Sequence, residues 1–279
     1  MEQIIIKKIK QIKFHPSSVK DLMMGFDTKG CQQTIVTHFL EQVMGRPDIE
    51  VDSLYTMKGN MVEAESIRMI SKKFNNIYTK NTKQYSNDWF VGTPDVIDSE
   101  NNFVIDAKSR YDLSTYMSMS EKETREKHED QMQCYMDMLG FAKAYVCNTL
   151  VNTPEPIVLE ERRKATSGII YSSPKYQMMD EEQKTLEAER IERNVIKNHT
   201  FYGERCQELG IEEIPEHLRI NIVEIDRDDD RLDKIKQRIE DARNWLIAWY
   251  TQKTDFVPKK LDLYRKIDDK KVGNVISQL

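Results

Sequence analysis

The sequence predicts an α/β fold of strands and helices, and three observations support this prediction. Short runs rich in Val, Ile and Phe, bounded by Gly, Pro, Asp or Asn, are typical of strands. They alternate with longer segments in which apolar residues recur at helical spacing. The 279 residues are 39% hydrophobic, which is enough to bury a sizeable core between such layers.

We expect one domain over residues 1–279. The formal net charge of −5 argues against a broad basic surface, but it is compatible with a local basic groove. The chain divides into a helical N-terminal cap (1–50), a core that carries the candidate site (53–150), a charged helical insertion (155–215), a strand plus closing helix (217–252) and a tail (253–279).

Two further patterns indicate the compartment. The start MEQIIIKKIK has only a short apolar run and no small-residue cleavage site, and no stretch approaches the ~18 apolar residues of a membrane span. We therefore expect a cytoplasmic protein without membrane contact. No C-x-x-C pair is present, so reduced thiols are expected at Cys31, Cys134, Cys147 and Cys206.

The N-terminal cap is predicted to be helical. Pro16-Ser17-Ser18 is typical of a helix start, with serine as the cap. A second helix is expected over 31–44 and is ended by Gly45-Arg46-Pro47. A third follows over 53–74, where helical spacing predicts four buried apolar positions: Met57, Met61, Ile67 and Ile70.

Residues 89–110 are predicted to form a β-hairpin. The turn-forming run 98–102 separates two apolar strands, 89–97 and 103–107. Gly92-Thr93-Pro94 predicts a bend in the first strand, because proline cannot donate to the ladder.

This hairpin is expected to bring two acids and an amine together. Side chains alternate across a strand, so Asp106 and Lys108 share one face of the second strand. The bend in the first strand brings Asp95 toward them. Two carboxylates with a neighbouring cation are typical of a site for a divalent metal.

The charged segment 111–130 is expected to be a mobile loop that leads into a helix. That helix covers 131–140 and ends at a glycine, and a strand follows over 144–147. Gln131 and Tyr135 are four residues apart, so they lie on one helix face.

The last predicted elements are a strand, an acidic turn and a helix. The helix is expected to pack against the sheet with an apolar stripe: Leu232, Ile235, Ile239, Ala242, Trp245, Leu246 and Trp249. The five histidines show no mutual metal-ligand spacing, so we expect ordinary surface or core roles for His15, His38, His128, His199 and His217.

Three motifs, taken in order, resemble those of a nuclease superfamily. Pro94-Asp95, ten further residues and Asp106-Ala107-Lys108 fit the PD-(D/E)XK signature. Residues 59–63 precede it with a Gly-x-x-x-Glu spacing, and residues 131–135 follow it with a Gln-x-x-x-Tyr spacing. Over 58–148 the chain looks like the lambda-type phage recombination exonucleases and the related RecB-like nuclease domains.

The resemblance implies a restriction-endonuclease-like core, in which helices flank a central mixed β-sheet, and a metal-dependent site. The implied catalytic residues are Asp95, Asp106, Lys108, Glu63, Gln131 and Tyr135. The implied ligands of Mg²⁺, for which Mn²⁺ can substitute, are Asp95, Asp106, the backbone carbonyl of Ala107, and Glu63 directly or through water. Glu65 is an alternative third acid. The lambda-type members more often have glutamate where this chain has Asp106. The cysteine spacing of the iron–sulfur RecB-like enzymes is missing, so no such cluster is expected.

The implied function is digestion of linear double-stranded DNA from a free end in phage-type recombination. The resemblance also implies a homo-oligomer, a trimer in the lambda-type enzymes, and a single-strand annealing protein as a partner, in a bacterial or phage-infected cell. Alternatives are an endonuclease, a RecB-like or CRISPR-associated nuclease, and a non-catalytic DNA-binding member of the fold.

Overall fold

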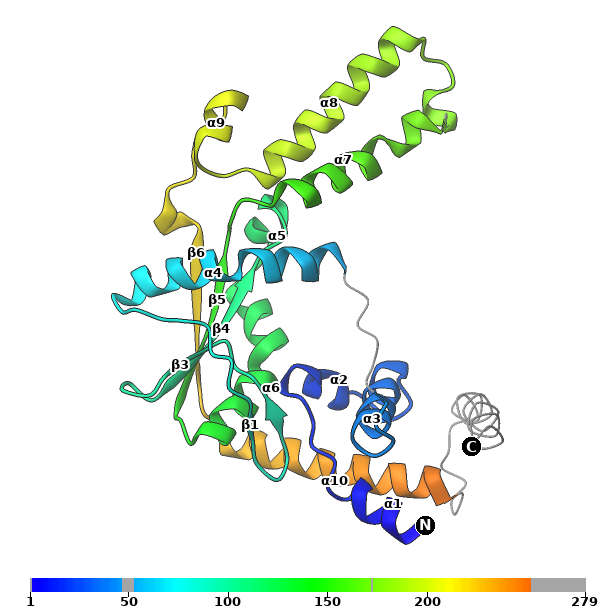
Figure 1. Cartoon of the computed structure of the whole chain (residues 1–279), viewed down its shortest axis with the longest axis vertical. Coiled ribbons are helices and arrows are strands. Elements are labelled where there is room, and N and C mark those ends of the chain that lie inside the picture. The colour runs from blue at the N-terminus through cyan, green and yellow to red at the C-terminus, as the bar shows by residue number, and fades with distance from the viewer. Residues whose placement is uncertain (1, 47–52, 172, 252–279) are drawn as a thin grey trace.

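A computed structural model describes residues 2–46, 53–171 and 173–251 (Figure 1). The α-helices are α1 (Glu2–Ile9), α2 (Val19–Leu22), α3 (Lys29–Gln42), α4 (Leu54–Phe74), α5 (Leu113–Met117), α6 (Glu121–Leu139), α7 (Glu155–Ile170), α8 (Glu181–His199), α9 (Glu204–Leu209) and α10 (Asp229–Thr251). The 3-10 helices are η1 (Pro16–Ser18), η2 (Pro174–Tyr176) and η3 (Glu216–Leu218). The strands are β1 (Tyr85–Ser86), β2 (Val91–Gly92), β3 (Val96–Asp98), β4 (Phe103–Ser109), β5 (Lys143–Thr149) and β6 (Ile220–Asp226). The expected tail, 253–279, lies outside the described residues.

The main sheet is mixed and has the strand order β3-β4-β5-β6. β4 and β5 are parallel, with Asp106 opposite Val146, whereas β3 pairs with β4 and β6 pairs with β5 in antiparallel fashion. Parallel neighbours need a crossover connection, and α6 supplies it. The predicted mixed sheet flanked by helices is confirmed.

The two faces of the sheet are covered by different helices. Val104 packs with Met132 and Met136 of α6 on one face. Ile105 packs with Ile67 of α4 on the other. The alternation along β4 therefore directs Asp106, which follows Val104 by two residues, toward α6.

The first expected strand, 89–97, is wrong as a single element. Two strands replace it: β2 pairs with the short β1, and β3 pairs with β4. Thr93-Pro94-Asp95, between β2 and β3, belong to neither strand. Proline cannot donate a ladder hydrogen bond, and the Asn81 side chain donates to the Pro94 carbonyl at 2.9 Å. The predicted turn over 98–102 is confirmed, with the Asn101 N–H donating to Asp98 at 2.9 Å.

The expectation of a mobile loop over 111–130 is also wrong. The segment contains α5 and the first half of α6. Capping boxes begin both helices, at Asp112 and at Ser120, and each satisfies backbone N–H groups that a helix start leaves unpaired. Gly140, with φ of 73°, ends α6 as predicted.

Helix α4 begins at the Ser53 cap, but its first half differs from the prediction. Met57 and Met61 are 37% and 52% exposed, because the buried side of this part of the helix is formed by other residues. One of them is Lys58, which is 1% exposed. Its amine donates to the carbonyls of Arg110 and Tyr111 at 2.8 and 2.7 Å, just past the end of β4. Burial lowers the pKa of Lys58 to about 7, although Asp112 opposes the shift.

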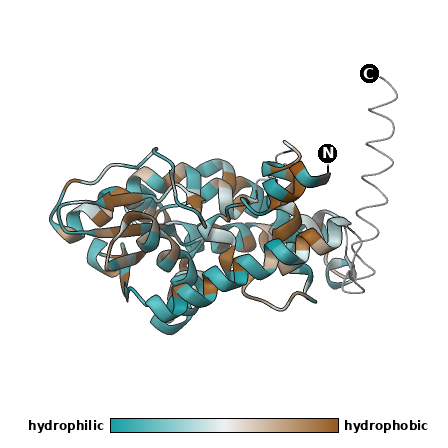
Figure 2. Ribbon diagram, turned by 90° about the horizontal axis from the view of Figure 1, so that it is seen from below, coloured by the Kyte–Doolittle hydropathy of each residue, from teal (hydrophilic) through white to brown (hydrophobic). Residues whose placement is uncertain are grey.

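The apolar stripe of α10 is buried as predicted, but its partner is different. It packs against α1, α2, α3 and α6, where Trp249 meets Phe39 edge-on at 5.8 Å between ring centroids. The closing helix therefore lies on other helices and not on the sheet, because α6 already covers the sheet face next to it. Figure 2 shows hydrophobic and hydrophilic residues interspersed along the helices.

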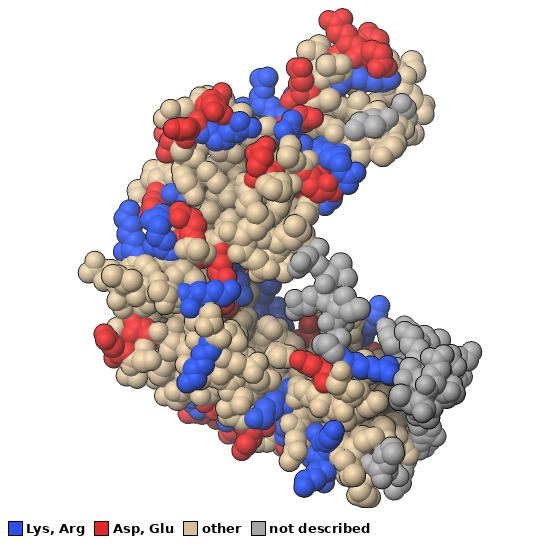
Figure 3. Space-filling model, viewed as in Figure 1, with Lys and Arg blue, Asp and Glu red and all other residues tan. Residues whose placement is uncertain are grey.

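The charged insertion forms an arm. Helices α7 and α8 pack side by side, joined by the Arg162–Glu192 ion pair, and project from the body (Figure 1). The surface is hollowed between this arm and the helices at the opposite end (Figure 3). The four cysteines are buried on α3, α6, β5 and α9. In the part of the chain that is described, no helix is both long and apolar enough to span a bilayer.

Candidate active site

Asp106 is the centre of the candidate site. It lies near the end of β4 and is 3% exposed. Its Oδ1 accepts a hydrogen bond from Gln131 Nε2 at 3.0 Å and forms an ion pair with Lys108 Nζ at 2.9 Å. Its Oδ2 is buried and has no hydrogen-bond partner. Side chains of the protein therefore bind Oδ1, whereas Oδ2 is available to a ligand.

Asp95 lies in the interruption between β2 and β3, which brings its side chain to β4. Its Oδ2 accepts a hydrogen bond from the Ala107 N–H at 2.8 Å. Burial and the nearby carboxylate of Asp106 raise the pKa of Asp95 to about 7. A buried acid whose ionised form is disfavoured by a neighbouring carboxylate is typical of a site that receives a cation.

Lys108 remains a cation in this setting. Burial lowers the pKa of its amine, but the carboxylates of Asp106 and Asp95 outweigh burial, so the pKa is raised overall. The side chain is 32% exposed, so water can reach it. The predicted juxtaposition of Asp95, Asp106 and Lys108 is what the structure shows.

Gln131 and Tyr135 lie on the face of α6 that meets the sheet. Gln131 orients Asp106 as described above, and the Tyr135 hydroxyl donates to the Thr93 carbonyl at 3.4 Å. Burial raises the pKa of Tyr135, so its phenol stays protonated. A Cβ at Gly92 would lie 2.9 Å from Pro16 Cδ and 3.3 Å from Tyr135 Cε1, which explains a glycine at this point.

The two candidate third acids on α4 differ in their surroundings. Glu63 forms an ion pair with Lys80, and its charge contributes to the raised pKa of Asp95, after burial and Asp106. Glu65 pairs with Arg68 at 2.9 Å, and Arg68 also binds Glu216. Glu63 acts on Asp95 whereas Glu65 is not among the charges that do, so Glu63 remains our candidate.

The residues present fit a hard divalent ion. The unpartnered Oδ2 of buried Asp106 and the carboxylate of Asp95 supply the oxygen donors that Mg²⁺ prefers. Within the described residues, no three His, Cys, Asp or Glu side chains form a complete ligand set. The Ala107 carbonyl and water would have to complete the coordination. Mg²⁺ commonly binds through one or two carboxylates and keeps several waters.

Two residues near the site were not predicted from the sequence. His128 is 6% exposed, which agrees with a core role, but its Nδ1 lies 4.0 Å from Asp106 Oδ2, a contact that the sequence did not predict. Burial lowers the pKa of His128 to about 4, so it is neutral at physiological pH. It precedes Gln131 by three residues, a spacing that puts both on one helix face. The second residue near the site that was not predicted is Arg110, which follows Lys108 by two positions.

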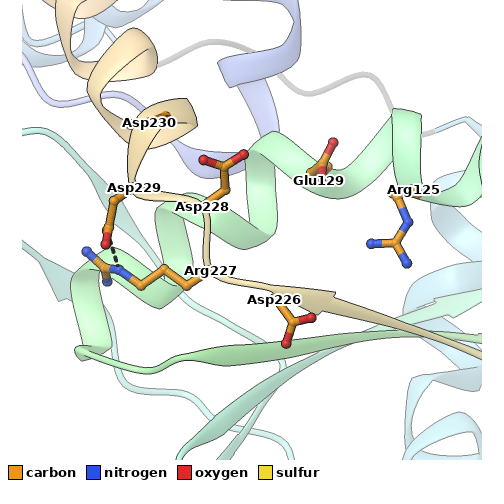
Figure 4. A pocket seen from close by; sticks show the side chains of 7 residues that line it. All are labelled: Arg125, Glu129, Asp226, Arg227, Asp228, Asp229 and Asp230. Atoms are coloured by element: carbon orange, nitrogen blue, oxygen red, sulfur yellow. Dashed lines mark hydrogen bonds and ion pairs between the residues drawn. The ribbon is translucent and has the colours of Figure 1, made fainter.

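A surface pocket of about 520 Å³ lies elsewhere, where β6 meets α10 (Figure 4). Five of its seven lining residues are acidic, and Arg227 is already paired with Asp229 at 2.7 Å. This surface would repel a phosphate, so it is not a candidate for binding DNA.

The acid pair has a measurable effect on stability without metal. The pKa of Asp95, about 7, lies above its unfolded value of about 3.9, so stability is lost as pH rises between these values. At pH 8 without metal, Asp95→Asn is expected to raise the Tm above that of the wild type, because the amide places no buried charge beside Asp106. Thermal unfolding at pH 5 and pH 8 measures this.

The same experiment includes its own controls. Glu100→Gln changes an exposed acid in the adjacent turn and should leave Tm unchanged. Added Mg²⁺ should raise the Tm of the wild type more than that of Asp95→Asn. A variant less stable than wild type at pH 8 without metal would contradict the proposed strain between the acids.

Comparison with known proteins finds relatives by structure only. No protein-family model matches the chain, and a search of curated proteins finds no match. A phage-related exonuclease from Haemophilus somnus 129PT superposes with a TM-score of 0.61 at 19% identity, covering 88% of this chain and 97% of that one. An alkaline exonuclease from Laribacter hongkongensis, LHK-Exo, superposes with a TM-score of 0.54 at 12% identity, covering 88% and 94%.

A second structure of LHK-Exo, in complex with dAMP, has a TM-score of 0.50 at 14% identity and covers 91% of this chain and 97% of its own. The matches extend over most of both chains, so they concern the whole architecture and not one motif. The structural resemblance to phage recombination exonucleases is thereby shown, and the chain has the fold of the phage-related and alkaline exonucleases.

Proposed function

We propose that this protein is a metal-dependent deoxyribonuclease that hydrolyses phosphodiester bonds. The observation that carries the proposal is the pair of carboxylates, Asp95 and Asp106, beside Lys108 at the end of β4. The nuclease fold supports it, because the structural neighbours are described as exonucleases. A degenerate, DNA-binding member of such a fold would be expected to have lost one of these three groups.

The chemistry follows from what each group can do. A bound Mg²⁺ would supply an activated water and stabilise charge on the phosphoryl oxygens. Asp95, Asp106 and the Ala107 carbonyl hold the ion, and Mn²⁺ has the same preference for oxygen ligands. Lys108 orients the attacking water and offsets charge on the phosphate. Gln131 fixes the rotamer of Asp106 through its hydrogen bond.

The finer proposal is an exonuclease that digests linear double-stranded DNA from a free end in phage-type recombination, within the cytoplasm. It rests on the descriptions of the structural neighbours and on the motif order in the sequence. A ring-like homo-oligomer, a trimer by resemblance, would retain DNA although the chain carries a net charge of −5. A single-strand annealing protein is the proposed partner, since it would bind the strand that is exposed.

Digestion of linear, nicked and covalently closed circular DNA tests this proposal. With Mg²⁺, the purified protein should degrade linear duplex and leave closed circles intact, because only the former offers an end. Asp106→Asn, purified in the same way, controls for a contaminating nuclease. Efficient cutting of closed circles by a protein that light scattering shows to be a monomer would move the proposal to an endonuclease. Absence of hydrolysis of any substrate would reject the nuclease proposal itself.

A further inference from the structure

Three cations near the candidate site have no acidic partner. Other cations on α6 form ion pairs, as Lys122 does with Glu126 at 3.7 Å and Arg125 with Glu121 at 3.4 Å. In contrast, among the described residues none of Arg110, Lys127 and Lys20 pairs with a carboxylate. In a chain with more acids than bases, unpaired cations gathered at one place call for a ligand.

Arg110 continues the row of side chains that carries the site. Its N–H donates to the Thr149 carbonyl at 2.8 Å, so the pairing with β5 extends one residue past β4. Alternation along the strand therefore places Arg110 on the same face as Asp106 and Lys108. Successive side chains on that face are roughly 7 Å apart along the chain. This is the scale of one nucleotide step along a DNA strand.

The guanidinium of Arg110 is held but only partly satisfied. One nitrogen donates to Asn148 Oδ1, and Asn148 in turn reaches Thr124 of α6 at 3.4 Å. Its Nε is buried and has no hydrogen-bond partner. Burial lowers the pKa of Arg110 to about 10, with Asp106 opposing the shift, so the group remains charged at neutral pH. The buried Nε is closed to a ligand, but the residue as a whole is only partly buried, and a fixed guanidinium that reaches the surface suits an oxyanion.

Lys127 and Lys20 extend the same positive region. Lys127 lies on α6 beside His128, and Lys20 lies on α2, which packs against α6. Burial lowers the pKa of Lys127, and the charges of Arg110, Lys20 and Lys108 lower it further. These cations therefore act on one another. Such repulsion is relieved when a polyanion binds.

We propose that Arg110, supported by Lys127 and Lys20, forms a phosphate-binding subsite for the DNA phosphate next to the scissile one. The proposal rests on the nuclease function above, because Asp95 and Asp106 define where the scissile phosphate lies. Arg110 is the central contact, since it shares a face with Lys108 and is oriented by Asn148. Its role is to fix the register of the strand on the site and not to react.

Singly substituted oligonucleotides test the proposal. Each of the phosphates flanking the scissile position is replaced in turn by a neutral methylphosphonate. Binding is measured by fluorescence anisotropy with Ca²⁺, which should support binding without comparable turnover. The wild type should lose roughly 10-fold in affinity at one flanking position, and Arg110→Gln should lose nothing more there.

Salt dependence gives a second measurement. For single-stranded DNA, the slope of log K against log salt should decrease in magnitude by about 0.7 for Arg110→Gln and should return toward wild type for Arg110→Lys. Lys127→Gln should show a smaller decrease. Lys122→Gln, on the same helix but ion-paired and exposed, is the matched control and should leave the slope unchanged. Thermal unfolding verifies that each variant is folded.

The outcomes separate this inference from the proposed function. If the enzyme hydrolyses DNA but Arg110→Gln responds to every methylphosphonate as the wild type does, the subsite is wrong and the nuclease stands. If the protein binds DNA with the predicted Arg110 dependence but hydrolyses nothing with Mg²⁺, the phosphate contact of Arg110 stands, whereas the nuclease proposal and the position of that contact next to a scissile phosphate fail. A kcat defect in Arg110→Gln with unchanged affinity and slope would also overturn the subsite.

Discussion

Replacing Asp106 by asparagine is expected to lower kcat for Mg²⁺-dependent hydrolysis of linear duplex DNA by roughly 10³-fold. The amide retains the shape of the side chain and still accepts from Gln131, but it removes the charge that binds the metal. Initial rates of nucleotide release, at saturating DNA, measure the loss. Because Oδ2 of Asp106 has no protein partner, the fold should tolerate the change.

The control for Asp106→Asn is Glu100→Gln, which removes an exposed acid from the same hairpin and should retain full activity. Ca²⁺ in place of Mg²⁺ should support DNA binding by the wild type without comparable turnover, since it is larger and less strict in geometry. Undiminished hydrolysis by purified, folded Asp106→Asn would remove the basis of the proposed site.

The second large effect is expected for Lys108→Met, with a loss of roughly 10²-fold in kcat. The methionine retains the length of the side chain but not the charge beside the attacking water. Metal affinity should not weaken, because removing a cation next to Asp106 cannot disfavour binding of another cation. Steady-state rates combined with Mn²⁺ titration by calorimetry separate the two quantities.

Lys143→Met is the matched control for Lys108→Met. Lys143 begins the neighbouring strand β5, is exposed and pairs with Glu224, so its loss should leave kcat unchanged. A Lys108→Met variant with wild-type kcat would show that the lysine is structural. A variant that loses metal affinity instead would show that Lys108 maintains the shape of the site and does not act on the water.

Local chemistry explains which parts of the fold were predictable. The turn after β3 follows from Asp98 and its Asx-type hydrogen bond, and the end of α6 follows from Gly140. Strand alternation placed Asp106 and Lys108 on one face, and helical spacing placed Gln131 and Tyr135 on one face of α6. Each of these depends on residues that are close in sequence.

Tertiary packing explains the rest. The charged first half of α6 was expected to be a loop, because its buried residues are mostly polar, such as Thr124 and His128. Their partners, Asn148 and Asp106, lie on strands that only the folded sheet brings near. Likewise, the apolar stripe of α10 predicted which face of the helix is buried, but not which elements that face packs against. The spacing of apolar residues along one helix does not identify the partner of that helix.

The buried amine of Lys58 limits how a DNA strand can enter. It joins α4, which carries Glu63, to the backbone just after β4, which carries Asp106. Pulling these elements apart would leave a desolvated amine without acceptors, at a cost of several kcal/mol. A DNA strand therefore has to reach the site without separating α4 from the end of β4, and amide hydrogen exchange should show slow opening at Arg110, whose N–H donates to the Thr149 carbonyl.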